Sequence, residues 1–268
     1  MIQLPREVKE PLAQNPKKIV IFAHTKVGKT TALAELQDAL LLDIENGADY
    51  VSAMKINVQE ECKKNNVNPL EFFKMLADTL EAEKNKTGKY PYDYIIVDTI
   101  TKIEDFARAY ATWLYKQQPL GKSFTGKDVV TELPNGAGYG WLRQAFEDIL
   151  APLEGKANVC LILVGHVKNA SINKNGKDLQ AKDLDLTGKL KGIVCAGADA
   201  IGYMYRNPTN ANQTILSFRT HEQDLATGAR PAHLSNQEFI ICELTNPDFA
   251  TKGEKRKFNT YWNKIFLS

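Results

Sequence analysis

The chain of 268 residues is 43% hydrophobic and 25% charged, a composition that excludes a chain disordered throughout and allows one sizeable core. Its apolar runs are far shorter than the ~20 residues of a membrane-spanning helix, and its first residues lack the layout of a secretion signal, so we expect a cytoplasmic protein without a membrane partner. Four widely spaced cysteines, with no Cys-x-x-Cys pair, favour reduced thiols over disulfides or zinc.

The net charge of +2 is unevenly distributed along the chain. Residues 116–127 carry three lysines and no acid, 168–191 carry six lysines and three aspartates, and 252–264 carry five basic residues and one glutamate. These windows have net charges of +3, +3 and +4, which leaves −8 for the remainder. Such segregation suits a face that binds a polyanion, although lysine-rich loops are more often simply solvated.

Short apolar runs alternate with stretches of helical periodicity through most of the chain. Strands are predicted at residues 18–23, 39–43, 92–98, 158–165 and 199–206. Helices are predicted at residues 68–86, 101–118 and 140–154. Because strands that alternate with helices form a mostly parallel sheet covered on both faces, the predicted fold class is α/β.

Two further kinds of segment complete the prediction. The pieces at 213–220 and 238–244 are strand-like and separated by turn residues, so we expect antiparallel extensions at the sheet edge. The polar stretches 119–138 and 168–190 show no regular pattern and are predicted to be structureless. Loops of that length within a compact domain tend to be functional or disordered.

A phosphate-binding loop is predicted at residues 23–30, "AHTKVGKT", between the first strand and a helix that begins near Lys29. Ala23 stands where the pattern usually has glycine. Gly28 lets the main chain approach the phosphates, Lys29 reaches the terminal phosphate oxygens, and the Thr30 hydroxyl is offered to Mg²⁺. The alternative is that this segment merely caps a helix. The residues predicted to contact the nucleotide are His24, Thr25, Lys26, Val27, Gly28, Lys29, Thr30 and Thr31.

A carboxylate for the same Mg²⁺ is predicted at Asp98, which follows the buried aliphatic residues of "YIIVD" as a Walker B aspartate does. Parallel strands bring their carboxyl ends to one edge of the sheet, so Asp98 is expected near Thr30. The alternative is that Asp98 or Thr99 caps the helix predicted at 101–118.

Two more strand ends carry polar side chains. The strand at 39–43 ends with Asp43, and Glu45 follows two residues later, near the expected terminal phosphate, which makes it the candidate general base for water. The strand at 158–165 leads into His166, a candidate sensor of the terminal phosphate that would pass its state to the lysine-rich stretch that follows. A solvated loop acid and an ordinary satisfied histidine are the alternatives.

In this order, the four strand ends resemble the RecA/RadA-type recombinase ATPase core, in which an Asp-x-Glu tip, here 43–45, supplies the catalytic glutamate. The usual sensor glutamine is replaced by His166. The segments "HTKVGKT" and "LLLDIENGAD" and the short first helix are especially similar to small phage-encoded RecA-like nucleotide-binding proteins, some of which act in single-strand annealing. The resemblance covers about residues 17–235. It implies a mostly parallel RecA-like P-loop sheet with ATP and Mg²⁺ as cofactors.

The resemblance also implies partners. The two polar stretches correspond to the family's DNA-facing loops, and single-stranded DNA is the implied ligand. The implied DNA-binding residues are four lysines and a base-stacking phenylalanine, namely Lys168, Lys174, Lys177, Lys182 and Phe124. Family members form homo-oligomers with ATP at the subunit interfaces, and a late basic residue completes the neighbour's site. Arg219 and Arg230 are the counterparts here, and Arg230 is preferred because it lies in a turn.

The predicted organisation is an N-terminal arm at 1–16, a RecA-like P-loop domain at 17–245 and a basic, aromatic tail at 246–268. The tail can bind DNA, dock on a neighbouring subunit or pack on the domain. Its aromatic residues are Phe258, Tyr261 and Trp262. The arm is too short for a separate DNA-binding or polymerisation domain.

The predicted function is Mg²⁺-dependent ATP hydrolysis coupled to single-stranded DNA binding in recombination, annealing or replication, in the host cytoplasm if the protein is phage-encoded. One alternative is a nucleotide-switch scaffold or helicase-loader-like partner without hydrolysis. A small-molecule kinase is disfavoured, because a kinase lid needs several arginines and residues 119–190 contain only Arg143.

Overall fold

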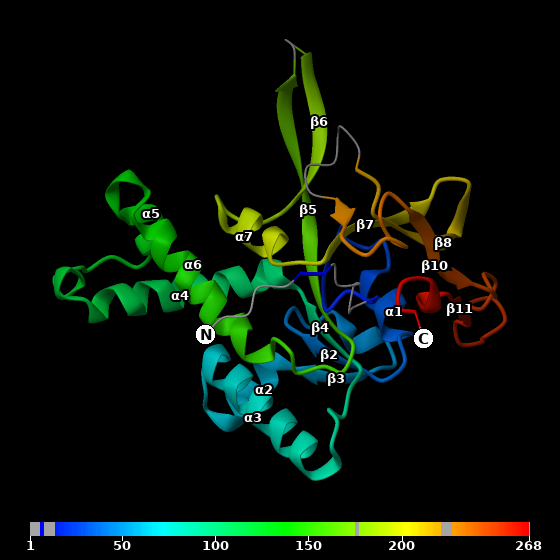
Figure 1. The fold of residues 1–268 in the computed structure, drawn as a ribbon, viewed down its shortest axis with the longest axis horizontal. Coiled ribbons are helices and arrows are strands. Elements are labelled where there is room, and N and C mark those ends of the chain that lie inside the picture. Colours follow the sequence, from blue (N-terminus) through cyan, green and yellow to red (C-terminus); the bar gives the residue numbers. More distant parts are fainter. Residues whose placement is uncertain (1–5, 8–13, 175–176, 221–226, 268) are drawn as a thin grey trace.

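The computed structural model describes residues 6–7, 14–174, 177–220 and 227–267 (Figure 1). Within them an eleven-stranded sheet runs through the molecule, with its main path in the order β11-β10-β8-β7-β1-β5-β4-β2-β3. The parallel strands are β1 (Lys18–Ala23), β2 (Ala39–Asp43), β3 (Met54–Asn57), β4 (Tyr94–Asp98), β5 (Cys160–Lys174) and β7 (Ala200–Asn207). The strands paired antiparallel are β6 (Lys177–Leu184), β8 (Asn210–Ser217), β9 (Gly228–Ala229), β10 (Glu238–Leu244) and β11 (Phe258–Thr260).

The position of β1 defines the topology. β1 pairs in parallel with β5 on one side and with β7 on the other, and β5 separates it from β4. The sheet is mostly parallel and is extended by antiparallel C-terminal strands, as the predicted RecA-like fold class requires. The prediction of the fold class is therefore confirmed.

Alternate side chains of the central strands enter two separate cores, one on each face of the sheet. Val20 and Phe22 of β1 pack on the face covered by most of the helices, whereas Ile19 and Ile21 pack on the other face with α1 and the C-terminal segment. This explains why the strands are almost continuously apolar. The helices are α1 (Lys29–Ala34), α2 (Val58–Asn65), α3 (Pro69–Thr87), α4 (Ile100–Gln117), α5 (Val129–Glu132), α6 (Gly138–Leu150) and α7 (Leu190–Ala196). No described helix has the length and apolar character required to span a membrane.

The stretch 168–190 was predicted to be structureless, and this prediction is wrong. β5 continues past the sheet to Lys174 and pairs with β6 from Val167↔Leu184 to Lys174↔Lys177. The resulting hairpin projects from the domain above the carboxyl ends of the parallel strands (Figure 1). Main-chain hydrogen bonds between the two strands hold the hairpin, so it needs no apolar alternation that the sequence would reveal.

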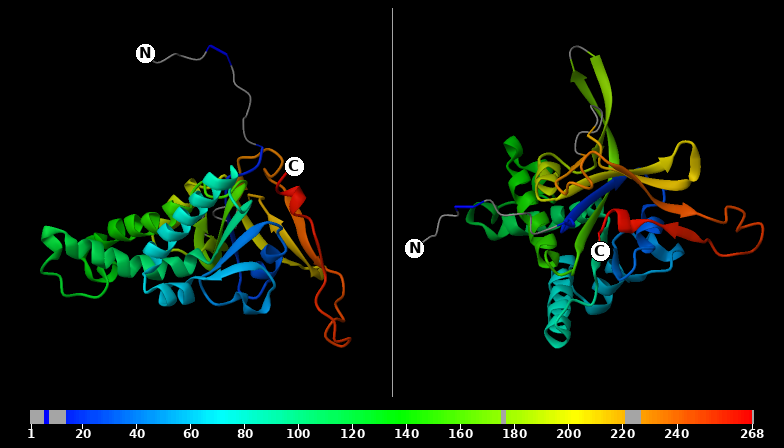
Figure 2. Two further views of the ribbon diagram at one scale, coloured as in Figure 1. Left: turned by 90° about the horizontal axis from the view of Figure 1, so that it is seen from below. Right: turned by 45° about the vertical axis from the view of Figure 1, so that its right-hand side comes forward.

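The stretch 119–138 is also more ordered than predicted. It contains α5 and two short 3₁₀ turns, and the side chains of Val129 and Val130 are buried. Asp128 accepts a hydrogen bond from the Arg108 guanidinium at 3.1 Å, which ties the connection to α4. The connection lies at the tip of an arm formed by α4 and α6, well away from the β5–β6 hairpin in both views of Figure 2.

The C-terminal segment is part of the domain. β11 pairs with β10, and Trp262 and Phe266 are buried in the core on the α1 face. The indole Nε1 of Trp262 donates a hydrogen bond to the Ala32 carbonyl at 3.0 Å. Of the three alternatives for the tail, packing on the domain is therefore the one observed for these two aromatic residues.

Candidate nucleotide-binding site

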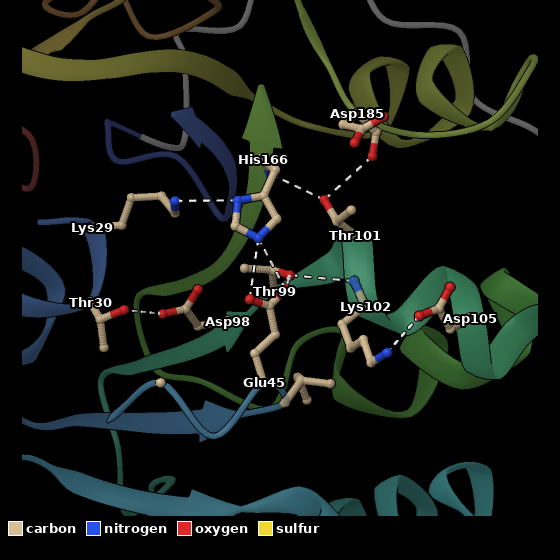
Figure 3. A network of polar contacts seen from close by, with 12 residues as sticks. Lys29, Thr30, Glu45, Asp98, Thr99, Thr101, Lys102, Asp105, His166 and Asp185 are labelled. Carbon is tan, nitrogen blue, oxygen red and sulfur yellow. Dashed lines mark hydrogen bonds and ion pairs between the residues drawn. The ribbon is translucent and has the colours of Figure 1, made fainter. Parts of the chain in front are cut away.

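The carboxyl ends of four parallel strands bring the predicted site residues to one edge of the sheet (Figure 3). The pairing places Ala23 of β1 beside His166 of β5, and Asp43 of β2 beside Asp98 of β4. Glu45 lies just beyond β2. Residues far apart in the sequence thus surround the N-terminus of α1.

The phosphate loop, residues 24–28, makes its turn with left-handed backbone at Lys26 (φ 63°) and Gly28 (φ 93°). Gly28 is the N-cap of α1, and no side chain caps the helix. The N–H groups of the first turn are therefore left for a ligand, which favours a phosphate site over the helix-cap alternative. The left-handed φ of Gly28 favours glycine at this position, and a Cβ there would also lie 2.6 Å from Arg206 Nη2, so the arginine would have to shift.

The Lys29 ammonium lies inside the site. The side chain is buried, and Nζ donates a hydrogen bond to the His24 carbonyl at 3.1 Å. Burial lowers the pKa of Lys29, while the nearby charges of Asp98 and Glu45 oppose that shift. A buried ammonium beside the first turn of α1 is suited to receive phosphate oxygens.

Asp98 and Thr30 are in contact. The Thr30 hydroxyl donates a hydrogen bond to Asp98 Oδ2 at 2.6 Å. Asp98 is buried, and burial raises its pKa against the opposing effects of the Thr30 bond and the Lys29 charge. Thr99, and not Asp98, caps α4, since its side chain accepts a hydrogen bond from the Lys102 N–H. The capping alternative therefore applies to Thr99 only.

The Thr30–Asp98 pair can be compared with what Mg²⁺ needs. No group of three or more His, Cys, Asp or Glu side chains suited to a metal occurs among the described residues. Mg²⁺ in nucleotide sites uses one or two protein oxygens and takes its other ligands from phosphates and water. Thr30 and Asp98 offer hard oxygen atoms beside the phosphate loop, so this pair fits the cation.

Glu45 is presented by a turn that Asp43 stabilises. The buried Asp43 carboxylate accepts main-chain hydrogen bonds from Glu45, Gly47 and Ala48 at 3.2, 3.1 and 2.9 Å. The Glu45 side chain remains 34% exposed and accepts a hydrogen bond from the Thr99 hydroxyl. The bond with His166, followed by the bond from Thr99, lowers the pKa of Glu45. Glu45 is therefore an ionised, oriented carboxylate and not a freely solvated loop acid.

His166 connects this carboxylate to the phosphate lysine and to the hairpin. Its Nε2 lies 3.0 Å from Glu45 Oε1, and its Nδ1 lies 3.5 Å from Lys29 Nζ. Its main-chain N–H donates to the Thr101 hydroxyl at 3.0 Å, and its carbonyl accepts from the Asp185 N–H at 2.9 Å. The histidine therefore belongs to one polar network with the base of the hairpin (Figure 3).

The predicted DNA-binding residues are only partly brought together. Lys168 Nζ donates to the Leu186 carbonyl at 2.7 Å, and Lys182 Nζ lies 4.4 Å from the centre of the Tyr203 ring. The main chains of Lys174 and Lys177 face each other near the end of the hairpin, but their side chains lie outside the described part of the structure.

Phe124 lies apart from these lysines. It packs edge-on against Tyr115, with 5.5 Å between ring centres, in the α4–α6 arm. The structure does not bring Phe124 together with the hairpin lysines, because the arm and the hairpin project in different directions (Figures 1 and 2); its base-stacking role stays a prediction.

Arg230 is also remote from the phosphate loop of its own chain. It follows β9, which pairs with the first residues of β7. Arg230 therefore lies at the amino-terminal ends of the parallel strands, opposite to the ends that carry the phosphate loop. The guanidinium contacts Asp199 at 3.2 Å and donates to the Ala196 carbonyl at 3.0 Å. A role in a neighbouring subunit's site stays a prediction. Arg219 likewise lies beside Glu238, at 3.9 Å.

The sequence reasoning missed Arg206. This residue lies near the carboxyl end of β7, the strand beside β1. Its Nη2 lies beside Gly28, 2.6 Å from where a Cβ would stand, and its Nη1 donates to the Thr214 hydroxyl at 3.0 Å. The signal was present, because the strand predicted at 199–206 ends in this arginine. What was missing was the knowledge that this strand neighbours β1.

The strand order, the uncapped phosphate loop and the convergent side chains define the class of RecA-like P-loop ATPase domains. Residues 15–228 match the AAA domain family, and the chain belongs to this family.

Solved structures and curated proteins were also compared with the chain. A crystal structure of the RadB recombinase is 12% identical, covers 87% of this chain and 89% of its own, and has a TM-score of 0.39. A KaiC-like protein from the hyperthermophilic archaeon Pyrococcus horikoshii OT3 is 11% identical, covers 77% of this chain and 80% of its own, and has a TM-score of 0.36. The comparison with curated proteins gave no match.

Proposed function

We propose that this protein is a Mg²⁺-dependent ATPase of the phage recombination type, whose turnover is coupled to single-stranded DNA in recombination, annealing or replication. One observation carries the proposal. His166, which contacts both Glu45 and Lys29, lies on β5, the strand that continues into the projecting hairpin. A change at the terminal phosphate therefore has a direct covalent path to the proposed DNA-binding element.

The nucleotide is held by the phosphate loop. The free N–H groups at the start of α1 and the Lys29 ammonium bind the phosphates, and Thr30 with Asp98 holds Mg²⁺. When bound, Mg²⁺ supplies charge neutralisation between the phosphate oxygens. Burial of Lys29 and Asp98 strengthens these interactions, because the local dielectric constant is lower than in water.

Glu45 acts as the general base. Its carboxylate is ionised at neutral pH, since its bonds to His166 and Thr99 lower its pKa. The two donors also fix its orientation, so it can accept a proton from a water aligned with the terminal phosphate. His166 is a positioning residue in this scheme, because it acts on the water through Glu45.

The coupling uses the base of the hairpin. Thr101 accepts from the His166 N–H and donates to the Asp185 carbonyl at 3.3 Å, and Asp185 donates back to the His166 carbonyl. Movement of His166 toward or away from the phosphate shifts both hairpin strands relative to α4. The hairpin lysines then engage or release the DNA backbone.

Assembly completes the proposal. We infer a homo-oligomer in which Arg230 of one subunit approaches the nucleotide of the next. The exposure of Arg230 supports this role, since 66% of its side chain is accessible and the side chain of its partner Asp199 is 30% accessible. An arginine supplied across an interface stabilises the charge that develops on the transferred phosphate.

The test is the ATPase rate with and without single-stranded DNA. We expect DNA to stimulate hydrolysis, and Glu45→Gln to lower the rate by about 10²–10⁴-fold while ATP still binds. Glu147→Gln, an exposed carboxylate on α6, is the matched control and should retain the wild-type rate. ATP binding without turnover in the wild type would instead support a nucleotide switch, and phosphate transfer to a nucleoside would support a kinase.

A further inference from the structure

A cavity of about 560 Å³ opens beside the phosphate loop. Gly28, Thr30 and Thr31 line one end of it. The remaining wall comes from the turn after β2, from the β7–β8 turn and from the connection between β10 and β11. Its volume lies within the range of about 300–1,000 Å³ that is common for small-ligand sites.

The phosphate loop has Glu45 and His166 on one side and the cavity on the other, and this arrangement determines how a bound nucleotide is oriented. Lys29 faces Glu45 and His166 on one side, which is the side of the terminal phosphate, and neither of these two residues lines the cavity. Lys29 itself and Thr31, two positions further into α1, do line it. A triphosphate with its last phosphorus near Glu45 therefore directs its sugar and base into the cavity.

The wall of the cavity is aromatic and basic where the base would lie. Tyr50 is 96% exposed, although it is a large aromatic side chain. On the β10–β11 connection, the Arg256 guanidinium lies 5.1 Å from the centre of the Phe249 ring. Tyr50, Phe249 and Arg256 all line the same cavity.

The β10–β11 connection is held in one conformation by its own hydrogen bonds. Asn246 accepts from the Lys257 N–H at 2.8 Å and donates to the Lys255 carbonyl at 2.9 Å. The Glu254 N–H donates to the Phe249 carbonyl at 2.8 Å. These bonds fix Phe249 relative to Arg256 before any ligand arrives, which reduces the entropy lost on binding.

We propose that Tyr50 and the Phe249–Arg256 pair form a stacking clamp for the purine base of the nucleotide. This inference rests on the proposed function, since it assumes that the phosphate loop binds a nucleoside triphosphate. The guanidinium and rings recognise the face of the base, and Arg256 offers only hydrogen-bond donors, which the acceptor atoms of both adenine and guanine satisfy. The clamp therefore favours purines over the smaller pyrimidines and discriminates weakly between ATP and GTP.

The experiment compares ligands with and without a base by calorimetry in the presence of Mg²⁺. ATP, GTP, CTP and inorganic tripolyphosphate are titrated into the wild type and into Tyr50→Ala, Phe249→Ala and Arg256→Ala. For each variant we expect ATP and GTP to bind about tenfold more weakly, while tripolyphosphate binds as it does to the wild type. Phe249→Tyr should restore the affinity, because it keeps the ring.

Two controls remove side chains outside the cavity wall. Lys255→Ala lies next to Arg256 in sequence, and Trp113→Ala removes an exposed aromatic ring from α4. Both should bind all four ligands normally. The clamp is wrong if Phe249→Ala and Arg256→Ala bind ATP as tightly as the wild type, or if tripolyphosphate weakens in parallel with ATP. If neither tripolyphosphate nor ATP binds the wild type, the proposed function itself fails, and the clamp with it.

Discussion

The imidazole Nε2 of His166 lies 3.0 Å from the carboxylate Oε1 of Glu45. The other ring nitrogen, Nδ1, lies 3.5 Å from the Lys29 ammonium, which can only donate. The neutral ring that satisfies both neighbours carries its proton on Nε2, donates it to Glu45 and accepts from Lys29. His166 thus lowers the pKa of the proposed base, Glu45, and also contacts Lys29, the lysine proposed to bind the phosphates.

The first prediction concerns the acidic limb of the pH–rate profile. The bond from His166 is the largest contribution that lowers the pKa of Glu45, so wild-type activity should be lost only when pH falls below the ordinary range of a glutamate. In His166→Ala the pKa of Glu45 rises and the limb moves to higher pH. Steady-state kcat measured from acidic to neutral pH checks this shift. His166→Gln keeps a donor and should move the limb less; identical limbs in all three proteins would contradict the role of His166.

The second prediction concerns the stability of the nucleotide-free protein. Burial raises the pKa of Asp98, so stability is lost progressively as pH rises from the ordinary pKa of an aspartate to that raised value, and the full loss remains above it. Asp98→Asn removes the charge, and its amide oxygen can still accept from Thr30. At neutral pH we expect Asp98→Asn to raise the free energy of unfolding by about 1 kcal/mol, while Mg²⁺-dependent hydrolysis is lost. Thermal melts at several pH values measure this effect.

The stability difference between Asp98→Asn and the wild type should depend on pH. The advantage of Asp98→Asn should disappear at pH values below the ordinary pKa of an aspartate, where the wild-type carboxyl is protonated in both the folded and the unfolded state. Asp49→Asn, an exposed aspartate after β2, should leave the melting temperature unchanged. A melting temperature of Asp98→Asn below that of the wild type at neutral pH would show that the charge stabilises the fold.

The third prediction concerns the hairpin lysines. Lys174 and Lys177 are opposite each other near its end, whereas Lys168 is tied to the Leu186 carbonyl at its base. The double change of Lys174 and Lys177 to Ala should therefore remove phosphate contacts without loosening the base. The slope of log affinity against log salt for single-stranded DNA should become shallower by about 1.4, which is ~0.7 for each contact. Replacing Lys63 and Lys64 of α2 by Ala is the control, and an unchanged slope in the hairpin variant would exclude these contacts.

The fourth prediction concerns the C-terminal segment. Trp262→Phe keeps a buried ring but leaves the Ala32 carbonyl without the indole donor. The free energy of unfolding should fall by about 1–3 kcal/mol, the cost of a buried group that loses its partner. Denaturant unfolding measures this, with Trp113→Phe, a change of an exposed indole on α4, as control. No loss of stability in Trp262→Phe would mean that water replaces the indole donor.

Much of the fold could be predicted because its central strands are short apolar runs. The observed bounds of β1, β2 and β10 equal the predicted ones, at 18–23, 39–43 and 238–244. β3 and the β5–β6 hairpin were missed for one reason: β3 is a partly exposed edge strand and the hairpin is polar, so neither shows the apolar pattern that sequence reasoning uses. Their hydrogen bonds to neighbouring strands hold them in place.

Some residues of the candidate site could likewise be predicted from the sequence, and others could not. Glu45, Asp98 and His166 could be placed together from the sequence, because the carboxyl ends of parallel strands share one edge; their chemical roles stay predictions. Arg206 and the Phe249–Arg256 pair could not. They reach the phosphate loop through the pairing of β7, β8 and β10, and no local pattern states which strands become neighbours.

The place of β1 in the sheet also has a consequence for synthesis on the ribosome. β1 is made early, yet its hydrogen-bonding partners β5 and β7 emerge only after most of the chain has been translated. A nascent polypeptide that ends after β4 carries the complete phosphate-loop motif but no strand on either side of it. A ligand that binds only the completed loop can therefore stabilise the fold only after β7 has been made, and until then the apolar side chains of β1 lack the neighbouring strands that cover them.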